Sequence, residues 1–398
     1  MKMKSLKILL CVTLTVSSFW GNYTTYAKAF TNSTQVLNNS DLNKVKSNIN
    51  KVLSSKYEVM KTWKVSNLND VINNSALLDL INKHNTFDAS WYKKFNFKIN
   101  SYNPSVNIDS ISKTSSNTYV LNITYDVTFR VNTSNSDSRA DDKKIVEIKF
   151  ENNNWYITKL LDVDKYNNSS SSKNYKKVNN LIKADNTVNV IESSDYTNEI
   201  NSETNDINDM SSNIDEYYNN VRDYCISSKN TKNDIVTSKQ QILKASNYSG
   251  YNSAAAVDYA HRYAISPNPW YRYYEDDDCT NFASQIVNAG GVPTTWTWYS
   301  SMPTRLSPAW YCVVPFFDYM VSNGYASAPD GGCRHAQLGD ILQLSRNPGT
   351  WTHTIIVTKI DSNYMYYSAH SVSRYDEPVI TAFTEKNYKF IRLLKFWH

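Results

Sequence analysis

The chain has 398 residues, of which 20% are charged and 41% hydrophobic, and its formal net charge is +5. This length is enough for two domains and their linkers. Four lysines lie in the first 29 residues, which contain no acidic residue, so the rest of the chain is near +1 and its charge gives no support for nucleic-acid binding.

Residues 1–29 have the form of a secretory signal peptide. Three lysines precede an apolar run from Ile8 to Trp20, and Ala27-Lys28-Ala29 has the small-x-small pattern of a cleavage site. The run is short for a bilayer span, and no later run reaches membrane-spanning length. We therefore expect a secreted, extracellular protein without a transmembrane anchor, which can associate with a cell wall.

Residues 30–162 are predicted to form a small α+β domain of unknown role. Apolar residues recur at helical spacing from Ser40 to Lys83, and the spacing changes to two between Phe95 and Asp162. Helices followed by an antiparallel meander make an α+β fold, which resembles the cystatin-like or nuclear-transport-factor-like layouts. His84 lacks reactive neighbours in the sequence and is expected on the solvated surface.

Residues 163–245 are rich in Asn, Ser, Asp and Lys and contain few large aliphatic side chains. Such composition predicts a polar linker, mostly disordered, including the stretch from Ser202 to Asn213. One helix is expected within it, around Ile214 to Ser227.

Residues 246–398 are predicted to form a second domain, with helices first and then an antiparallel sheet. Helices are expected at 254–260, after Cys279, and from Val313 to Ser322, where Asn323-Gly324 ends the pattern. Alternating or short apolar runs predict the strands, at 341–344, 353–360, 364–371, 379–382 and 390–396.

Cys279 is the strongest candidate for a nucleophile. Phe282, Ala283 and Ile286 follow it at helical spacing, which places the cysteine in the first turn of a helix, where the backbone N–H groups favour a thiolate. Asp278, directly before the helix, is predicted to be its N-cap. The neighbouring carboxylates at 275–277 are interpreted as a solvated loop, with Ca²⁺ or cationic substrate as the alternative.

His353 is predicted to act as the general base, and His370 to orient it. A two-residue turn at Asp361-Ser362 places the two histidines opposite each other on neighbouring strands, and an even change of register keeps them on one face. A third group that orients the base is typical of nucleophile–base pairs. Asp376 and Asp340 are lesser candidates for this role, and turn stabilisation is the simpler interpretation of Asp340.

The string from Asp278 to Gln285, DCTNFASQ, followed by Ala289-Gly290-Gly291, resembles the signature of the bacterial putative amidase domain family. Trp351 with His353, and Ala369-His370-Ser371, also match its pattern. The family is similar to the NlpC and CHAP cell-wall hydrolases, and the resemblance covers about residues 248–398. It implies a papain-like fold with Cys279 as nucleophile, His353 as base, and His370 in the position of the third polar residue.

The predicted function is a secreted, monomeric cysteine amidohydrolase that acts on peptidoglycan or its stem peptides, without a cofactor or metal. Thiolate attack on an amide carbonyl gives an acyl-enzyme, the backbone N–H of Cys279 helps to bind the oxyanion, and His353 protonates the leaving amine. A tyrosine from the group Tyr271, Tyr273 and Tyr274 is expected to supply a second donor, with Tyr274 as the representative choice. The identity of the amide bond stays open.

Aromatic residues near these positions have two interpretations. Trp296, Trp298 and Trp351 are predicted either to form a substrate groove or to pack a small core.

Two other functions remain open. A zinc site would use Cys333 and His335 with Cys312 or His353, although no paired CxxC or HExxH motif is present. The same fold can also serve as a catalytically inactive wall-binding or adhesion module. A disulfide between Cys312 and Cys333 is a further option.

Overall fold

The computed structural model describes residues 37–162, 193–226, 250–274, 277–301, 305–329 and 336–396. The predicted signal peptide, the carboxylates Glu275 and Asp276, and the Cys333-x-His335 pair lie outside these ranges. Within them, none of the helices has both the length and the apolar character that a membrane crossing requires.

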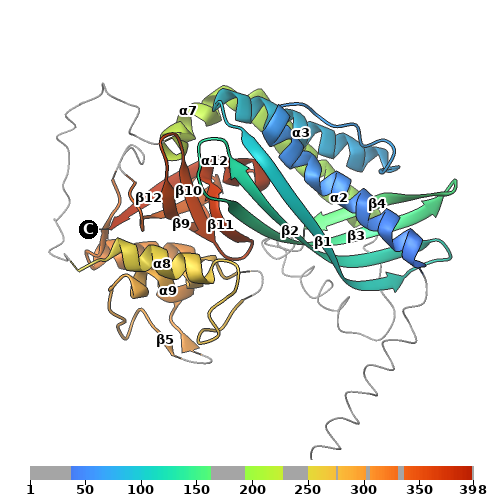
Figure 1. Cartoon of the computed structure of the whole chain (residues 1–398). Coiled ribbons are helices and arrows are strands. Elements are labelled where there is room, and N and C mark those ends of the chain that lie inside the picture. Colours follow the sequence, from blue (N-terminus) through green and yellow to red (C-terminus); the bar gives the residue numbers. More distant parts are fainter. Residues whose placement is uncertain are drawn as a thin grey trace, which may run out of the picture.

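The N-terminal half has the predicted order of helices followed by antiparallel strands. Residues of β2 alternate between buried and partly buried over the whole strand, as the period of two predicts. α2 and α3 lie across one face of the resulting meander (Figure 1). The elements are α2 (Asn39–Thr62), α3 (Ser75–Lys94), β1 (Ile99–Lys113), β2 (Thr118–Val131), β3 (Ser138–Glu151) and β4 (Asn154–Asp162).

The C-terminal half also begins with helices and continues with antiparallel strands, which confirms an α+β fold. The predicted helix 313–322 and strand 390–396 have the expected bounds, and β11 was not predicted. The elements are α8 (Ser253–Tyr263), α9 (Cys279–Ala289), β5 (Ser300–Ser301), β6 (Arg305–Leu306), α10 (Pro308–Tyr311), α11 (Val313–Ser322), β7 (Ala326–Ser327), β8 (Ile341–Asn347), β9 (Thr350–Ile360), β10 (Met365–Ala369), β11 (Ser373–Pro378), α12 (Val379–Glu385) and β12 (Phe390–Phe396).

The two halves share one sheet. Its strand order is β1-β2-β3-β11-β10-β9-β8-β12-β7, with β4 also paired to β3. The halves join where β11 lies antiparallel to β3, with Arg374 opposite Ala140 and Tyr375 opposite Arg139. Although the sequence predicts two domains on either side of a linker, backbone hydrogen bonding is continuous between them in the described structure.

Residues 193–226 form two packed helices, in contrast to the disordered stretch predicted there. α6 (Ser193–Ser212) lies against α3, and α7 (Ile214–Cys225) corresponds to the one helix expected in this region. Tyr196, Ile207 and Met210 of α6 are buried. The prediction of disorder for 202–213 was wrong because these few apolar residues recur on one helical face and reach an existing core.

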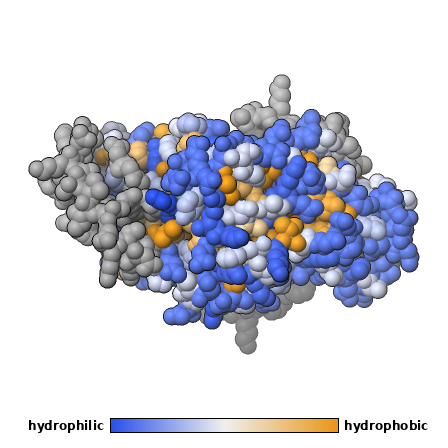
Figure 2. Space-filling model, turned by 90° about the horizontal axis from the view of Figure 1, so that it is seen from above, coloured by the Kyte–Doolittle hydropathy of each residue, from blue (hydrophilic) through white to orange (hydrophobic). Residues whose placement is uncertain are grey.

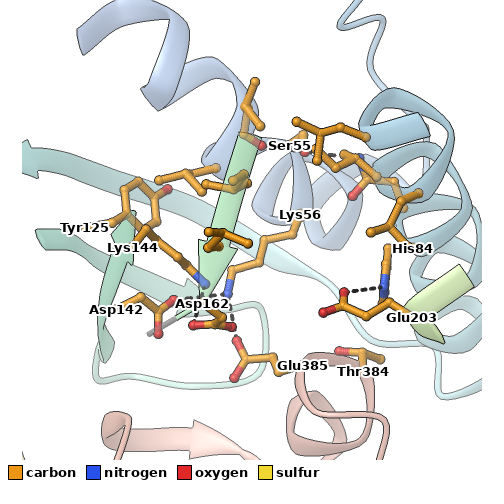
Figure 3. A pocket seen from close by; sticks show the side chains of 18 of the residues that line it. Ser55, Lys56, His84, Tyr125, Asp142, Lys144, Asp162, Glu203, Thr384 and Glu385 are labelled. Atoms are coloured by element: carbon orange, nitrogen blue, oxygen red, sulfur yellow. Dashed lines mark hydrogen bonds and ion pairs between the residues drawn. The ribbon is translucent and has the colours of Figure 1, made fainter. Parts of the chain in front are cut away.

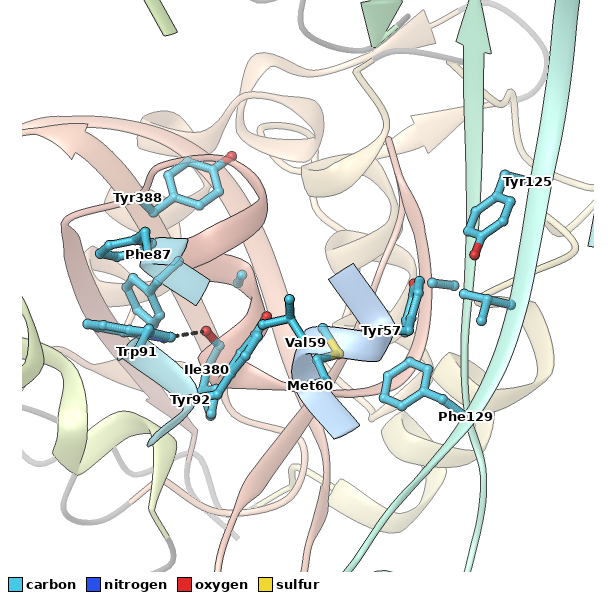
Figure 4. Packing of buried hydrophobic residues seen from close by; sticks show 14 of the residues in the cluster. Tyr57, Val59, Met60, Phe87, Trp91, Tyr92, Tyr125, Phe129, Ile380 and Tyr388 are labelled. Carbon is cyan, nitrogen blue, oxygen red and sulfur yellow. Dashed lines mark hydrogen bonds between the residues drawn. The ribbon is translucent and has the colours of Figure 1, made fainter. Parts of the chain in front are cut away.

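The run Val379–Ala382, predicted as a strand, is the beginning of α12. All residues from Val379 to Thr384 are buried, so the segment shows no polar face. A short run that is apolar on every side does not distinguish a buried helix from a buried strand. α12 covers the same sheet face as α3, and Trp91 of α3 donates a hydrogen bond to the carbonyl of Ile380 at 3.1 Å (Figure 4).

The C-terminal sheet is covered on both faces. One face packs α8, α9, α10 and α11 around Phe282, Trp310 and Ile356. The other face joins the large core of the N-terminal half, to which Ile355 and Val357 of β9 belong. On the face seen in Figure 2, the surface is mostly hydrophilic and apolar residues gather in small groups.

A buried ionic cluster lies at the junction of the halves. Arg374 of β11, 3% exposed, contacts Asp142 of β3 at 2.7 Å, Glu377 at 2.6 Å and Glu385 of α12 at 2.9 Å. Lys56 of α2 contacts Glu385 at 2.7 Å. Charges of opposite sign from both halves therefore compensate one another where β3 meets β11.

Candidate active site

Cys279 is the first residue of α9, as the sequence predicts, and lies against the sheet. The residue is 3% exposed, and every position from Cys279 to Val287 is buried. Its Sγ is 3.7 Å from the hydroxyl of Thr280, which in turn lies 2.9 Å from the hydroxyl of Thr354 on β9. The sulfur therefore lies on the side of α9 that faces β9, at the beginning of the helix.

Asp278 is the N-cap residue of α9, as predicted, but its side chain makes no capping hydrogen bond. Ser371 caps the helix instead, because its Oγ accepts from the N–H of Asp278 at 3.0 Å and from the N–H of Cys279 at 3.1 Å. The N–H expected to bind an oxyanion is therefore occupied by Ser371. Sequence reasoning missed Ser371, although it directly follows His370 in the quoted motif.

The Asp278 carboxylate instead joins three structural elements. Oδ1 accepts from the backbone N–H of Tyr274 at 3.1 Å and from the amide of Asn281 at 2.7 Å. Oδ2 lies 2.7 Å from Nδ1 of His370. Since Asp278 is 1% exposed, the carboxylate is a fixed, fully buried link between the loop before α9, the helix and the end of β10.

His370 is 1% exposed and lies on the α9 side of the sheet. Its ring stacks on Phe282 of α9 with centroids 3.7 Å apart, and its Nε2 is 2.7 Å from the carbonyl oxygen of Tyr263. A carbonyl only accepts, so Nε2 carries a proton. A second proton lies between Nδ1 and the Asp278 carboxylate. The pair therefore holds two protons in this arrangement.

The structure does not bring His353 to Cys279. Thr354 and Ile356 face α9, whereas His353, Ile355 and Val357 point to the opposite face of β9. The ring of His353 stacks on Tyr388 there, with centroids 5.8 Å apart. The predicted pairing of the Cys279 thiol with a base at His353, and the orientation of His353 by His370, therefore do not match this geometry.

The sequence predicts that His353 and His370 lie on one face of the sheet, and a β-bulge explains why they do not. Tyr366 pairs with Lys359 in the register that the hairpin sets, but the next residue, Tyr367, pairs with Val357, so Thr358 is an extra residue in β9. One inserted residue reverses which side chains face each side of the sheet. Beyond the bulge, His370 and His353 consequently lie on opposite faces.

The surroundings of both side chains favour their neutral forms. Burial, with a contribution from Asp277, raises the pKa of the Cys279 thiol to about 11. Burial of the ring, followed by the positive charges of Lys386 and Arg374, lowers the pKa of His353 to about 3, although the residue keeps some exposed surface. Near neutral pH, Cys279 is a thiol and His353 an uncharged imidazole.

We expect slow alkylation of Cys279 in the native protein. With a thiol pKa of about 11, the thiolate fraction at pH 8 is roughly one in a thousand, and it rises about tenfold per pH unit. Labelling with iodoacetamide from pH 7 to 10, followed by peptide mass spectrometry, measures this dependence. Complete labelling of Cys279 within minutes at pH 7 would show that the thiol is ionised and accessible.

The other proposed carboxylates have structural contacts. Asp376 lies 2.8 Å from Nε2 of His261 and accepts a hydrogen bond from Thr358 at 2.8 Å. Asp340 accepts from the N–H groups of Gln337 at 2.7 Å and Phe396 at 2.9 Å, which agrees with the turn-stabilising interpretation. Neither contact joins these carboxylates to His353.

The predicted groove residues occupy different environments. Trp298 is fully buried, and its indole N–H donates to Ser284 at 3.2 Å, so it belongs to the core. Trp296 is 89% exposed. Trp351 is partly buried beneath the guanidinium of Arg392, 4.5 Å from the ring centroid. Tyr274 is partly buried, and its ring lies 4.9 Å from the Arg272 guanidinium.

The described residues contain no group of three or more metal-binding side chains. Cys312 is a partly buried free thiol, whereas Cys333 and His335 lie outside the described ranges. The zinc hypothesis and the Cys312–Cys333 disulfide therefore depend on residues that the structure does not describe.

Comparison with known proteins locates the similarity in this half of the chain. Residues 250–393 match a family described as "Putative amidase domain". A segment of 151 residues is 33% identical to the uncharacterized protein YjcM of Bacillus subtilis (strain 168), covering 35% of this chain and 36% of that protein. The chain thus spans little more than a third of this relative's length, and the family description suggests amide hydrolysis.

A comparison of three-dimensional structures gives a weak match to one solved protein. The intermembrane space region of chloroplast protein ARC6 aligns with 29% of this chain and 95% of its own, at 11% identity and a TM-score of 0.21. A likeness this weak carries no argument about fold or function.

Proposed function

We propose that residues 250–393, the segment that matches the putative amidase family, hydrolyse an amide bond with Cys279 as the nucleophile. The observation that carries this proposal is the joint placement of a buried thiol and a buried histidine–carboxylate pair at one helix N-terminus. Attack by the sulfur on the amide carbonyl gives an acyl-enzyme and a free amine, and water then releases the acid. We also propose that α9 and the antiparallel sheet have a papain-like arrangement.

His370, rather than His353, is the proposed base. Its ring already packs on α9 through Phe282, and Asp278 fixes Nδ1. To accept the thiol proton, Nε2 must first lose its own proton to solvent and leave the Tyr263 carbonyl. The same nitrogen then gives the proton to the leaving amine. Asp278 is a positioning residue that keeps the imidazole in the required tautomer.

The Cys279 N–H has to exchange partners as well. In the described arrangement it donates to Ser371 at 3.1 Å, so an oxyanion can use this donor only after the Ser371 hydroxyl moves aside. One such donor contributes roughly 3 kcal/mol to an acyl-transfer transition state. We therefore propose that substrate binding shifts the His370-Ser371 turn.

The proposed substrate is bacterial peptidoglycan or its stem peptides. Support comes from the secretory form of residues 1–29 and from the resemblance of the cysteine motif to cell-wall hydrolases. The form of residues 1–29 also supports secretion, and we further propose a monomer that needs no cofactor. The bond cleaved is either the muramoyl–alanine amide or one between stem residues.

The two histidines give the test that distinguishes the proposed base from the one predicted from sequence. We expect His370→Gln to reduce amine release from purified peptidoglycan by at least 10²-fold, and His353→Gln to retain activity within about threefold, since general-base catalysis contributes roughly 10² to 10⁴. Rates are measured by labelling new amines, with circular dichroism of each variant to check folding. Loss of activity in a folded His353→Gln variant, with activity kept in His370→Gln, would reverse the assignment.

A second candidate function is a catalytically inactive wall-binding or adhesion module. It is favoured by the buried thiol, by the occupied Cys279 N–H and by the two engaged nitrogens of His370. If the protein has this function, we expect it to sediment with peptidoglycan and to produce no new termini in the digest. Release of amines by wild type and not by Cys279→Ala excludes it.

A further inference from the structure

A cavity of about 200 Å³ lies at the junction of the two halves, and none of the residues of the cysteine motif lines it. Side chains from α2, α3, β3, β4 and α6 line it together with Arg374 of β11 and Glu385 of α12. Figure 3 shows Lys56, Lys144 and Asp162 on one side of this space, and His84 with Glu203 on another. Both halves of the protein therefore build its wall.

The cavity has an apolar part and a charged part. Leu77, Leu80 and Ile81 of α3, with Ile200 of α6, supply aliphatic surface. The basic side chains are already paired: Lys56 contacts Glu385 at 2.7 Å and Lys144 contacts Asp162 at 3.0 Å. The described lining has four Lys or Arg residues against six acids, which are Asp88, Asp142, Asp162, Glu199, Glu203 and Glu385. The excess of acid favours a cationic ligand.

Asp88 distinguishes this cavity from an ordinary packing defect. The residue is 6% exposed, lines the cavity, and its Oδ1 has no hydrogen-bond partner among the described residues. An unsatisfied buried polar group costs about 1–3 kcal/mol of stability. Burial raises the pKa of this carboxyl to about 8, because the nearby Lys56 charge offsets the desolvation only in part. Folding alone does not account for a carboxyl at this position.

We propose that the cavity binds a small amine with an apolar body, whose ammonium group pairs with the Asp88 carboxyl and stabilises its ionised form. The ammonium donates to the Asp88 carboxylate from the cavity side, and the aliphatic wall takes the hydrocarbon part. The volume lies below the 300–1,000 Å³ of sites for drug-sized ligands, so the ligand is small. This site is separate from the proposed amide hydrolysis.

Three probes of matched size test the charge requirement on the full-length protein. Hexylammonium, hexanol and hexanoate carry the same alkyl chain with a positive, neutral or negative head. By isothermal titration calorimetry and thermal melting, we expect hexylammonium to bind at least tenfold more tightly than the other two and to raise the melting temperature. Equal or tighter binding of hexanoate, or no binding of hexylammonium at millimolar concentration, would overturn the proposal.

Variants of α3 locate the binding group. We expect Asp88→Asn to weaken hexylammonium binding at least tenfold, and Asp79→Asn, an exposed site on the same helix, to leave it unchanged. Asp88→Leu should melt at the same or a higher temperature than wild type without ligand, since it removes an unpartnered carboxyl. Unchanged affinity in Asp88→Asn contradicts the assignment. Cys279→Ala should bind hexylammonium like wild type, which separates this proposal from the catalytic one.

Discussion

Cys279→Ala is expected to lower the release of new amines from peptidoglycan by on the order of 10³-fold or more, because no other group replaces a covalent nucleophile. The measurement is mass spectrometry of a digest of purified peptidoglycan, which also identifies the cleaved bond. The substitution removes only a sulfur atom from a buried site, so the circular dichroism spectrum and melting temperature should stay close to those of wild type.

Cys312→Ala is the matched control. Cys312 is also a free thiol in the same half of the protein, but it is partly buried and does not lie at the beginning of α9. Its replacement should leave the rate within about twofold. Equal amine release by wild type and Cys279→Ala would end the nucleophile assignment, and loss of activity in both variants would point to a general effect of removing thiols.

Arg374→Ala is expected to lower the free energy of unfolding by about 3–5 kcal/mol, because truncating one partner of a buried ionic cluster leaves uncompensated charge. Arg374 is 3% exposed and contacts Asp142, Glu377 and Glu385. Burial with these carboxylates keeps the pKa of the guanidinium well above its usual range, so the arginine is charged throughout the accessible pH range. Urea unfolding followed by circular dichroism measures the loss.

Arg139→Ala provides the comparison, since Arg139 also lies at the β3–β11 pairing but is 46% exposed where it contacts Asp126 at 3.0 Å. An exposed ion pair contributes about 0–1 kcal/mol. If Arg374→Ala lost no more stability than Arg139→Ala, the buried cluster would not be a stabilising contact between the halves.

The sequence predicted the elements with clear periodicity. The alternating run of β2, the helix that begins at Cys279, and the bounds of α11 and β12 are confirmed. In these segments the apolar pattern and the flanking Gly, Asn and Asp residues indicate the same element. The α+β class follows from the order of these segments and is confirmed for the described residues.

The site was predicted only in part, because its geometry depends on contacts between distant segments. The pairing of His370 with Asp278 spans 92 positions. The bulge at Thr358, which moves His353 to the opposite face, leaves no mark in a sequence whose apolar residues continue on both sides of it. Likewise, capping of α9 by Ser371 requires knowing that the end of β10 reaches the helix.

The pairing of β3 with β11 has a consequence for how the protein can be divided. A fragment that began near residue 246 would leave β11 as a bare sheet edge, with its N–H and C=O groups open to other chains, and would expose apolar surface of β10 and α12 that α7 and α3 now contact. Such a fragment should self-associate. The first half thus covers a sheet edge of the second, so we expect a well-behaved fragment to retain both.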